Sequence, residues 1–204
     1  MRRSMPRIVR SSARSAGAMG DLYLALLHHP VHDKNGAVVT TAVTNMDVHD
    51  FGRLARTFGA RAFYVTTPVA TQRRLVERIM RHWETGPGAT YNVTRKEALA
   101  LARLADDLDA VVADVEREAG ALPCLVATSA REGTGRVSFG DLRRRMAQDP
   151  RPLVLVFGTG WGLTADVLGR MEAILEPVRG TTGWNHLSVR AAAAIILDRL
   201  CGDR

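Results

Sequence analysis

Short apolar runs alternate with longer segments of helical period along most of the chain. Five runs have the length and continuous apolar character of strands buried on both faces: Leu22–Leu27, Val38–Val43, Ala62–Val65, Cys124–Ala127 and Leu153–Phe157. The segments between them predict helices at about Val48–Phe58, Ala70–Trp83, Leu108–Ala119, Ser138–Gln148, Ala165–Met171 and Ser188–Leu200. Ala98–Ala105 fits neither period cleanly, and we interpret it as a strand.

This alternation predicts an α/β fold: a mostly parallel sheet with helices on both faces. Ligands of such sheets bind outside the carboxyl ends of the strands. The 204 residues contain no repeat or low-complexity linker, so we expect one folded domain over residues 19–204. No apolar run approaches the roughly 18 residues that a membrane-spanning helix needs, and we expect a cytoplasmic protein.

The formal net charge of +7 arises largely at the start of the chain. Residues 1–18 hold no acid, and we expect a disordered basic extension there; a cleaved transit peptide, or Met19 as the true start, stays open. The rest of the chain is nearly balanced, although Arg143–Arg145 could contact phosphates or simply form a solvated helix face. The basic residues of the extension are Arg2, Arg3, Arg7, Arg10 and Arg14.

A glycine-rich loop follows the predicted strand Leu153–Phe157. Its glycines, Gly158, Gly160 and Gly162, permit positive φ and remove the Cβ atoms that would block a ligand. The loop could therefore offer backbone groups to a nucleoside, or form only a tight turn. It has no Walker lysine and lacks the third glycine and the acid of a dinucleotide fingerprint, which argues against a nucleotide triphosphatase and disfavours a nicotinamide-dependent oxidoreductase.

Two further polar segments could carry chemistry. Glycines punctuate residues 177–190 before a predicted alanine-rich helix that Ser188 or Asn185 could cap. In the segment 40–53, Asp47, Asp50 and Arg53 are spaced to share one helix face. A carboxylate there could take a proton, and the arginine could hold a phosphate; alternatively Asp47 caps the helix and Asp50 pairs with Arg53.

We predict no metal site and no hydrolase of the common types. His28 and His29 are adjacent on a predicted strand and would point to opposite faces, so these two residues and His32 do not form one set of metal ligands. Cys124 and Cys201 have no metal-binding spacing and are expected to be reduced.

Six segments together resemble a known family. Their order and spacing from Leu22 to Leu200 resemble those of a bacterial RNA methyltransferase family of the SPOUT superfamily, related to the tRNA guanine-N1 methyltransferases. The segments are LYLALLHHPVHDKNG (Leu22–Gly36), TAVTNMDVHDFGR (Thr41–Arg53), HWETGPG (His82–Gly88), LVATSA (Leu125–Ala130), FGTGWGL (Phe157–Leu163) and NHLSVRAA (Asn185–Ala192).

The resemblance implies a C-terminal trefoil knot, a homodimer and an RNA substrate, with tRNA expected. It also implies S-adenosylmethionine as methyl donor and S-adenosylhomocysteine as product, bound by three loops. The residues of those loops are Thr128, Ser129, Ala130, Phe157, Gly158, Thr159, Gly160, Trp161, Gly162, Leu163, Val178, Gly180, Asn185, His186, Leu187, Ser188 and Val189.

One position departs from a related pattern. Relatives that methylate the ribose 2′-oxygen have an asparagine six residues before an arginine, and here Asp47 precedes Arg53. Our hypothesis is that Asp47 or Asp50 is the base and that Arg53 orients RNA or charge. The acceptor nucleotide and atom stay open, and the alternative function is a noncatalytic RNA-binding or cofactor-sensing SPOUT module.

Overall fold

The computed structural model describes residues 20–203. The expected extension over residues 1–18 lies outside them. In chain order the elements are β1 Leu22–Leu27, β2 Val31–His32, β3 Val38–Val39, α1 Asn45–Thr57, β4 Ala62–Thr66, α2 Ala70–Glu84, α3 Gly88–Tyr91, α4 Val93–Leu99, β5 Ala102–Ala105, α5 Leu108–Ala119, β6 Cys124–Ala127, α6 Phe139–Gln148, β7 Leu153–Gly158, α7 Ala165–Leu168, β8 Ala173–Ile174 and α8 Val189–Cys201.

Six strands form one sheet in the order β5-β4-β1-β7-β6-β8, and every neighbouring pair is parallel. In register, Leu24 of the central β1 lies opposite Phe63 on β4 and Leu155 on β7. All carboxyl ends therefore lie at one edge of the sheet, as the parallel prediction required. The loops that follow β6 and β7 emerge side by side there.

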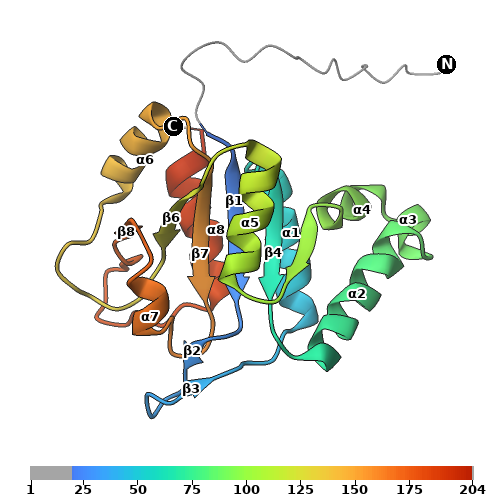
Figure 1. Cartoon of the computed structure of the whole chain (residues 1–204), viewed down its shortest axis with the longest axis horizontal. Helices are drawn as coiled ribbons and strands as arrows, with labels where there is room; N and C mark the ends of the chain where they lie inside the picture. The colour runs from blue at the N-terminus through green and yellow to red at the C-terminus, as the bar shows by residue number, and fades with distance from the viewer. Residues whose placement is uncertain (1–19, 204) are drawn as a thin grey trace.

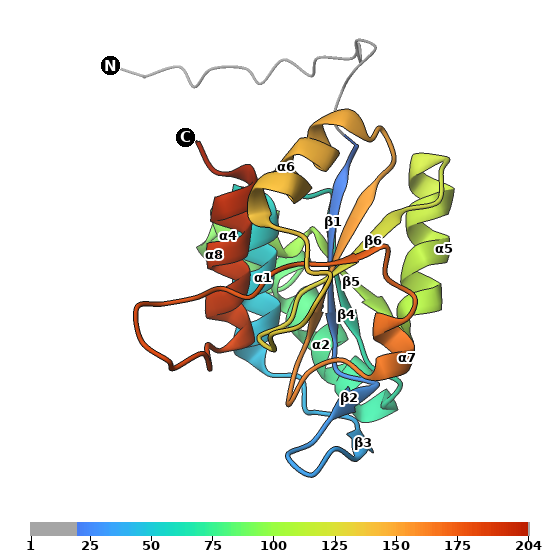
Figure 2. The same cartoon turned by 90° about the vertical axis from the view of Figure 1, so that its left-hand side faces the viewer.

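Helices cover both faces of this sheet, in agreement with the predicted fold class (Figures 1 and 2). On one face α1, α6 and α8 pack on the sheet through side chains such as Phe51, Leu142 and Leu197. On the other face α5 and α7 pack through Val111 and Val167. All six residues of β1 are buried because both faces are covered, which explains why the strand is apolar at every position.

Side-chain caps fix where the main helices begin. Ser138 accepts a hydrogen bond from the backbone N–H of Asp141 and caps α6. Ser188 accepts one from the backbone N–H of Ala191, so of the two caps predicted for α8 the structure has Ser188. At α1, Thr44 and Asp47 form a reciprocal capping box. These caps place the first turns of α1 and α8 at the carboxyl edge.

Some predicted elements were wrong or incomplete. The expected strand Val38–Val43 is only β3, which pairs with β2 outside the main sheet. The expected strand Ala98–Ala105 splits into the end of α4 and the strand β5, and α7 is shorter than the predicted helix Ala165–Met171. Helices α3 and α4 and strands β2 and β8 were missed, since all are too short to show a period.

None of the helices within residues 20–203 combines the length and the apolar character that crossing a membrane requires.

Candidate active site

Three loops meet at the carboxyl edge of the sheet. The Asn185 side-chain amide donates a 2.7 Å hydrogen bond to the carbonyl oxygen of Ala130, joining the loop before α8 to the loop after β6. The Arg131 guanidinium donates a 3.0 Å bond to the carbonyl oxygen of Trp161, joining the loops after β6 and β7. The structure thus brings together the three segments that the resemblance assigned to one cofactor. It also gives Asn185 this linking position, while Ser188 caps α8.

The glycines of the loop after β7 are explained first by the chain itself. A Cβ on Gly158 would lie 2.8 Å from the Cγ atom of Leu163, and one on Gly160 would lie 2.8 Å from the carbonyl oxygen of His32. Gly160 and Gly162 have φ values of +58° and +102°, which side chains rarely adopt. The glycines therefore fold the loop tightly against β2.

This folding leaves aromatic and apolar side chains on the outside of the loops. Trp161 is 54% exposed, Trp184 73% and Leu187 45%, and the ring of Trp184 contacts that of His186 edge to face. The side chains of Phe157 and Leu163 are buried, so these two residues can offer only backbone groups to a ligand. Exposed rings beside loop backbone fit adenosine, whose base needs an apolar face and hydrogen-bonding partners.

A buried polar cluster lies beneath the loop after β7. His28 is fully buried, its Nδ1 lies 3.1 Å from the hydroxyl of Thr41, and that hydroxyl bonds the hydroxyl of Thr159. The Thr159 hydroxyl donates in turn to the carbonyl oxygen of Leu27 at 3.1 Å. Burial lowers the pKa of His28, so the imidazole is neutral. His28 thus ties the glycine-rich loop to β1.

This cluster leaves one polar atom without a partner. The Nδ1 atom of His28 and the hydroxyl groups of Thr41 and Thr159 lie within hydrogen-bonding distance in turn, and the tautomer of the ring sets which atom of each pair donates. The Nε2 atom of His28 is buried and has no hydrogen-bonding partner within the described residues. The sequence suggests His28 only as a metal ligand; neither its burial nor its contact with Thr41 can be predicted from its position in the sequence.

The first turns of α1 and α8 are joined by ion pairs. The Arg190 guanidinium lies 3.0 Å from Asp47 Oδ1 and 3.2 Å from Asp50 Oδ2. Asp47 Oδ2 accepts bonds from the backbone N–H and the hydroxyl of Thr44 at 3.0 and 2.6 Å. Both oxygens of the buried Asp47 are therefore engaged, whereas the side chain of Asp50 is 43% exposed.

Two results here differ from the alternatives drawn from sequence. Asp50 pairs with Arg190 rather than with Arg53, although Asp47 does cap α1 as one alternative proposed. Arg53 is exposed, and no hydrogen bond or ion pair joins its side chain to another residue in the range 20–203. Sequence reasoning missed Arg190, because nothing local to it indicates a contact with residues more than 130 positions away.

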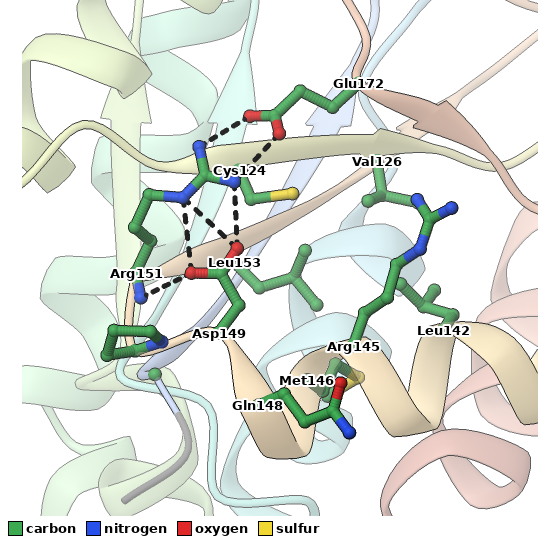
Figure 3. A pocket seen from close by; sticks show the side chains of 12 residues that line it. Cys124, Val126, Leu142, Arg145, Met146, Gln148, Asp149, Arg151, Leu153 and Glu172 are labelled. Carbon is green, nitrogen blue, oxygen red and sulfur yellow. Dashed lines mark hydrogen bonds and ion pairs between the residues drawn. The ribbon is translucent and has the colours of Figure 1, made fainter. Parts of the chain in front are cut away.

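A cavity also lies at the opposite end of the sheet. It has a volume of about 410 Å³, with Val126, Leu142 and Met146 among its apolar lining residues (Figure 3). On its rim the Arg151 guanidinium lies between Asp149 and Glu172 and hydrogen-bonds both carboxylates. Residues 20–203 contain no group of three or more His, Cys, Asp or Glu side chains that could hold a metal ion.

The sheet order and the three joined loops define the class of fold. A probable methyltransferase from Bordetella pertussis Tohama I superposes with a TM-score of 0.60 over 89% of this chain and 94% of its own, at 14% identity. The SpoU methyltransferase AviRb from Streptomyces viridochromogenes, solved in complex with AdoMet, superposes with a TM-score of 0.56 over 90% of this chain and 58% of its own, at 17% identity. The chain therefore has the SpoU-type methyltransferase fold.

Sequence comparison gives the family. Residues 21–202 match the model of the SAM-dependent RNA methyltransferase family, and the chain belongs to that family. Over 183 residues it is 46% identical to a tRNA (guanine-N(1)-)-methyltransferase of Oleidesulfovibrio alaskensis and 48% identical to one of Nitratidesulfovibrio vulgaris. The match covers 90% of this chain but only 42% of either relative. An uncharacterized protein of Aquifex aeolicus is 42% identical over 88% of both chains.

Proposed function

We propose that the chain binds S-adenosylmethionine in the three joined loops and transfers its methyl group to RNA, with tRNA as the substrate class. The observation that carries this proposal is the convergence of the loops through the bonds from Asn185 to Ala130 and from Arg131 to Trp161. The cofactor supplies an electrophilic methyl group on a sulfonium. The exposed indole of Trp161 and the loop backbone supply the adenosine-binding surface.

The guanine-N1 specificity of the two longer relatives is not carried over. The match spans 42% of the length of either relative, so their guanine-N1 activity is not assigned to this chain. Our proposal therefore stops at RNA methylation and assigns no acceptor atom.

Asp50 is the proposed base of this reaction. A general base needs an accessible oxygen within hydrogen-bond reach of the substrate. Asp47 fails this condition, since Thr44 and Arg190 occupy its two oxygens, whereas Asp50 is half-exposed beside the same arginine. We assign Asp47 the position of a support that holds α1 against α8, and Arg53 the role of orienting RNA.

Isothermal titration with S-adenosylmethionine and S-adenosylhomocysteine tests cofactor binding. Asn185→Ala removes the bond to Ala130 and should weaken binding about tenfold. Gly140→Ala on α6 lies outside the three loops, its Cβ would lie no closer than 3.7 Å to another atom, and it should bind normally. Gly160→Arg cannot test cofactor binding, because its side chain would collide with the carbonyl oxygen of His32 and disturb the loop itself. Absence of binding by the folded wild type would refute the proposal.

Transfer of labelled methyl groups to unfractionated tRNA tests the base. Asp50→Asn should lower the rate at least about 100-fold with cofactor affinity unchanged. Cofactor binding without any transfer by the wild type would instead favour the noncatalytic module.

We further propose a cytoplasmic homodimer with a trefoil knot. Trp161, Trp184 and Leu187 expose apolar surface typical of an interface. In support of the knot, the segment after β8 runs against the segment before α6, with Val137 and Glu176 bonded through backbone atoms at 2.9 Å (Figure 2). Light scattering on the purified protein tests the dimer, since a monomer at micromolar concentration would exclude it.

A further inference from the structure

A second hollow lies between α1 and α4. It has a volume of about 250 Å³ and is lined mainly by polar and basic side chains. Three guanidinium-bearing residues contribute to it, and Arg95 additionally lies with its guanidinium 5.1 Å from the centre of the Trp83 ring. The lining residues are Arg53, Arg56, Thr57, Asn92, Thr94, Arg95 and Ala98.

The charge of this groove is only partly compensated. Glu97 pairs with Arg56 at 3.3 Å, but both side chains are more than half exposed, so the pair contributes little and opens easily. Neither Arg53 nor Arg95 forms an ion pair with another residue of the described chain. Guanidinium groups present planar pairs of N–H donors that match phosphate oxygens. The groove therefore favours an anion with several oxygen atoms.

The position of the groove indicates a polymeric anion. Asp50, Arg53 and Arg56 lie on the same helix, α1, so the two arginines of the groove lie about 4.5 Å and about 9 Å along that helix from the proposed base. Next to Asn92 in the chain, Tyr91 is 87% exposed and Val93 58% exposed. An exposed ring beside a basic groove offers a stacking surface to an unpaired base, as single-stranded RNA requires.

We propose that the α1–α4 groove binds the phosphate backbone of an unpaired RNA segment and that Tyr91 stacks on one of its bases. The inference rests on the proposed function, because it assigns part of the substrate's path to the active site. The helices α2, α3 and α4 then form the RNA-docking side of the molecule. Arg53 contacts the substrate where the groove meets the active site, and Arg56 contacts a phosphate farther along.

Binding of unfractionated tRNA to the full chain, measured over a range of salt concentrations, tests this groove. Loss of one phosphate contact in Arg56→Ala should reduce the slope of log K against log salt by about 0.7 and weaken binding several-fold. Arg117→Ala is the matched control, since Arg117 is an exposed arginine (75%) on α5, on the other face of the sheet. This variant should change neither the affinity nor the salt slope. Tyr91→Ala should weaken binding with the salt slope unchanged, since stacking releases no counterions.

Cofactor titration of the same variants separates the two proposals. S-adenosylmethionine should bind Arg56→Ala and Tyr91→Ala as it binds the wild type. If wild type binds cofactor and tRNA while Arg56→Ala keeps both the affinity and the salt slope, the groove proposal is wrong and the proposed function stands. If wild type binds cofactor but no tRNA, both proposals fail.

Discussion

The two ends of the same parallel sheet differ in how their polar groups are satisfied. At the carboxyl end, His28 Nε2 lacks a hydrogen-bonding partner among the described residues, Arg53 is exposed without an ion pair there, and Trp161 lies open to solvent. At the amino end, Arg151 hydrogen-bonds Asp149 and Glu172 at once, and its donors point at carboxylates. Yet the larger cavity is at the amino end.

The difference teaches that volume alone is a poor guide to chemistry. The amino-end cavity has apolar lining residues and a rim on which Arg151 is already paired. Arg145 and Gln148 also line it, and no hydrogen bond or ion pair joins either side chain to another described residue. The carboxyl-end loops carry exposed and unpartnered groups that, on the proposed function, a cofactor and an RNA satisfy. On our proposal, the ligands and a second subunit complete this site. Such a site does not require a deep cavity in the free single chain.

The largest predicted effect concerns the ion pair at the carboxyl end. Asp47→Ala leaves Arg190 without its buried partner and removes the capping box of α1, and we expect the free energy of unfolding to fall by about 3 kcal/mol. Urea denaturation measures this loss. Asp47→Asn keeps a side-chain acceptor for Thr44 and should lose less. A loss below about 1 kcal/mol would show that the pair is not a support.

The next largest effect is a dependence of the free energy of unfolding on pH, which arises from His28 at the carboxyl end. His28 has a folded-state pKa below its unfolded value of 6.5 because it is buried. Its neutral form therefore supports full stability above pH 6.5, and stability is lost as pH falls below that value, by up to about 1.4 kcal/mol per pH unit. His28→Gln should remove most of this slope and leave a smaller one from His49, whose pKa burial also lowers. An unchanged slope would contradict the assignment.

Arg151→Ala at the amino end should cost less than the change at Asp47. The side chain of Arg151 is 41% exposed and its partners are partly exposed, so we expect a loss of about 1 kcal/mol in stability. The affinity for S-adenosylmethionine should not change, because Arg151 precedes β7 and the proposed cofactor loop follows the other end of that strand. A tenfold loss of affinity would mean that the two ends are coupled.

The smallest effect is expected at Cys124, which lines the amino-end cavity. Burial raises the pKa of the Cys124 thiol to about 11, so the reactive thiolate is scarce at pH 8. One hour with iodoacetamide at that pH should leave this cysteine unmodified by mass spectrometry and cofactor binding unaltered. Rapid modification would show that the amino end opens readily.

The sequence predicted the parts of this molecule that depend on local pattern. Four of the five predicted buried strands, the cap at Ser188 and the α/β class follow from period and residue type, and the structure confirms them. The resemblance grouped the three loops, whose hydrogen bonds the structure then showed. The cofactor and catalytic assignments of individual residues stay predictions.

What the sequence could not provide depends on contacts between distant segments. Arg190 reaches Asp47 across 143 positions, and the bond between Thr41 and Thr159 spans 118. No local pattern encodes such pairs, because any arginine or threonine of the chain could make them. The tight glycine turn was read correctly as a close approach, but the partner proved to be His32 of the same chain.

Strands β4 and β5 are neighbours in the sheet, yet the chain between them makes the long excursion through α2, α3 and α4. Phe63 pairs in register with Ala102, but the excursion also contributes Val76, Ala98 and Leu99 to the core, so an exchanged segment must keep these buried side chains. The three loops joined by Asn185 and Arg131 follow other strands of the sheet. On the proposed function, a graft between Ala70 and Leu99 that keeps these core residues offers a route by which the same loops serve a different RNA.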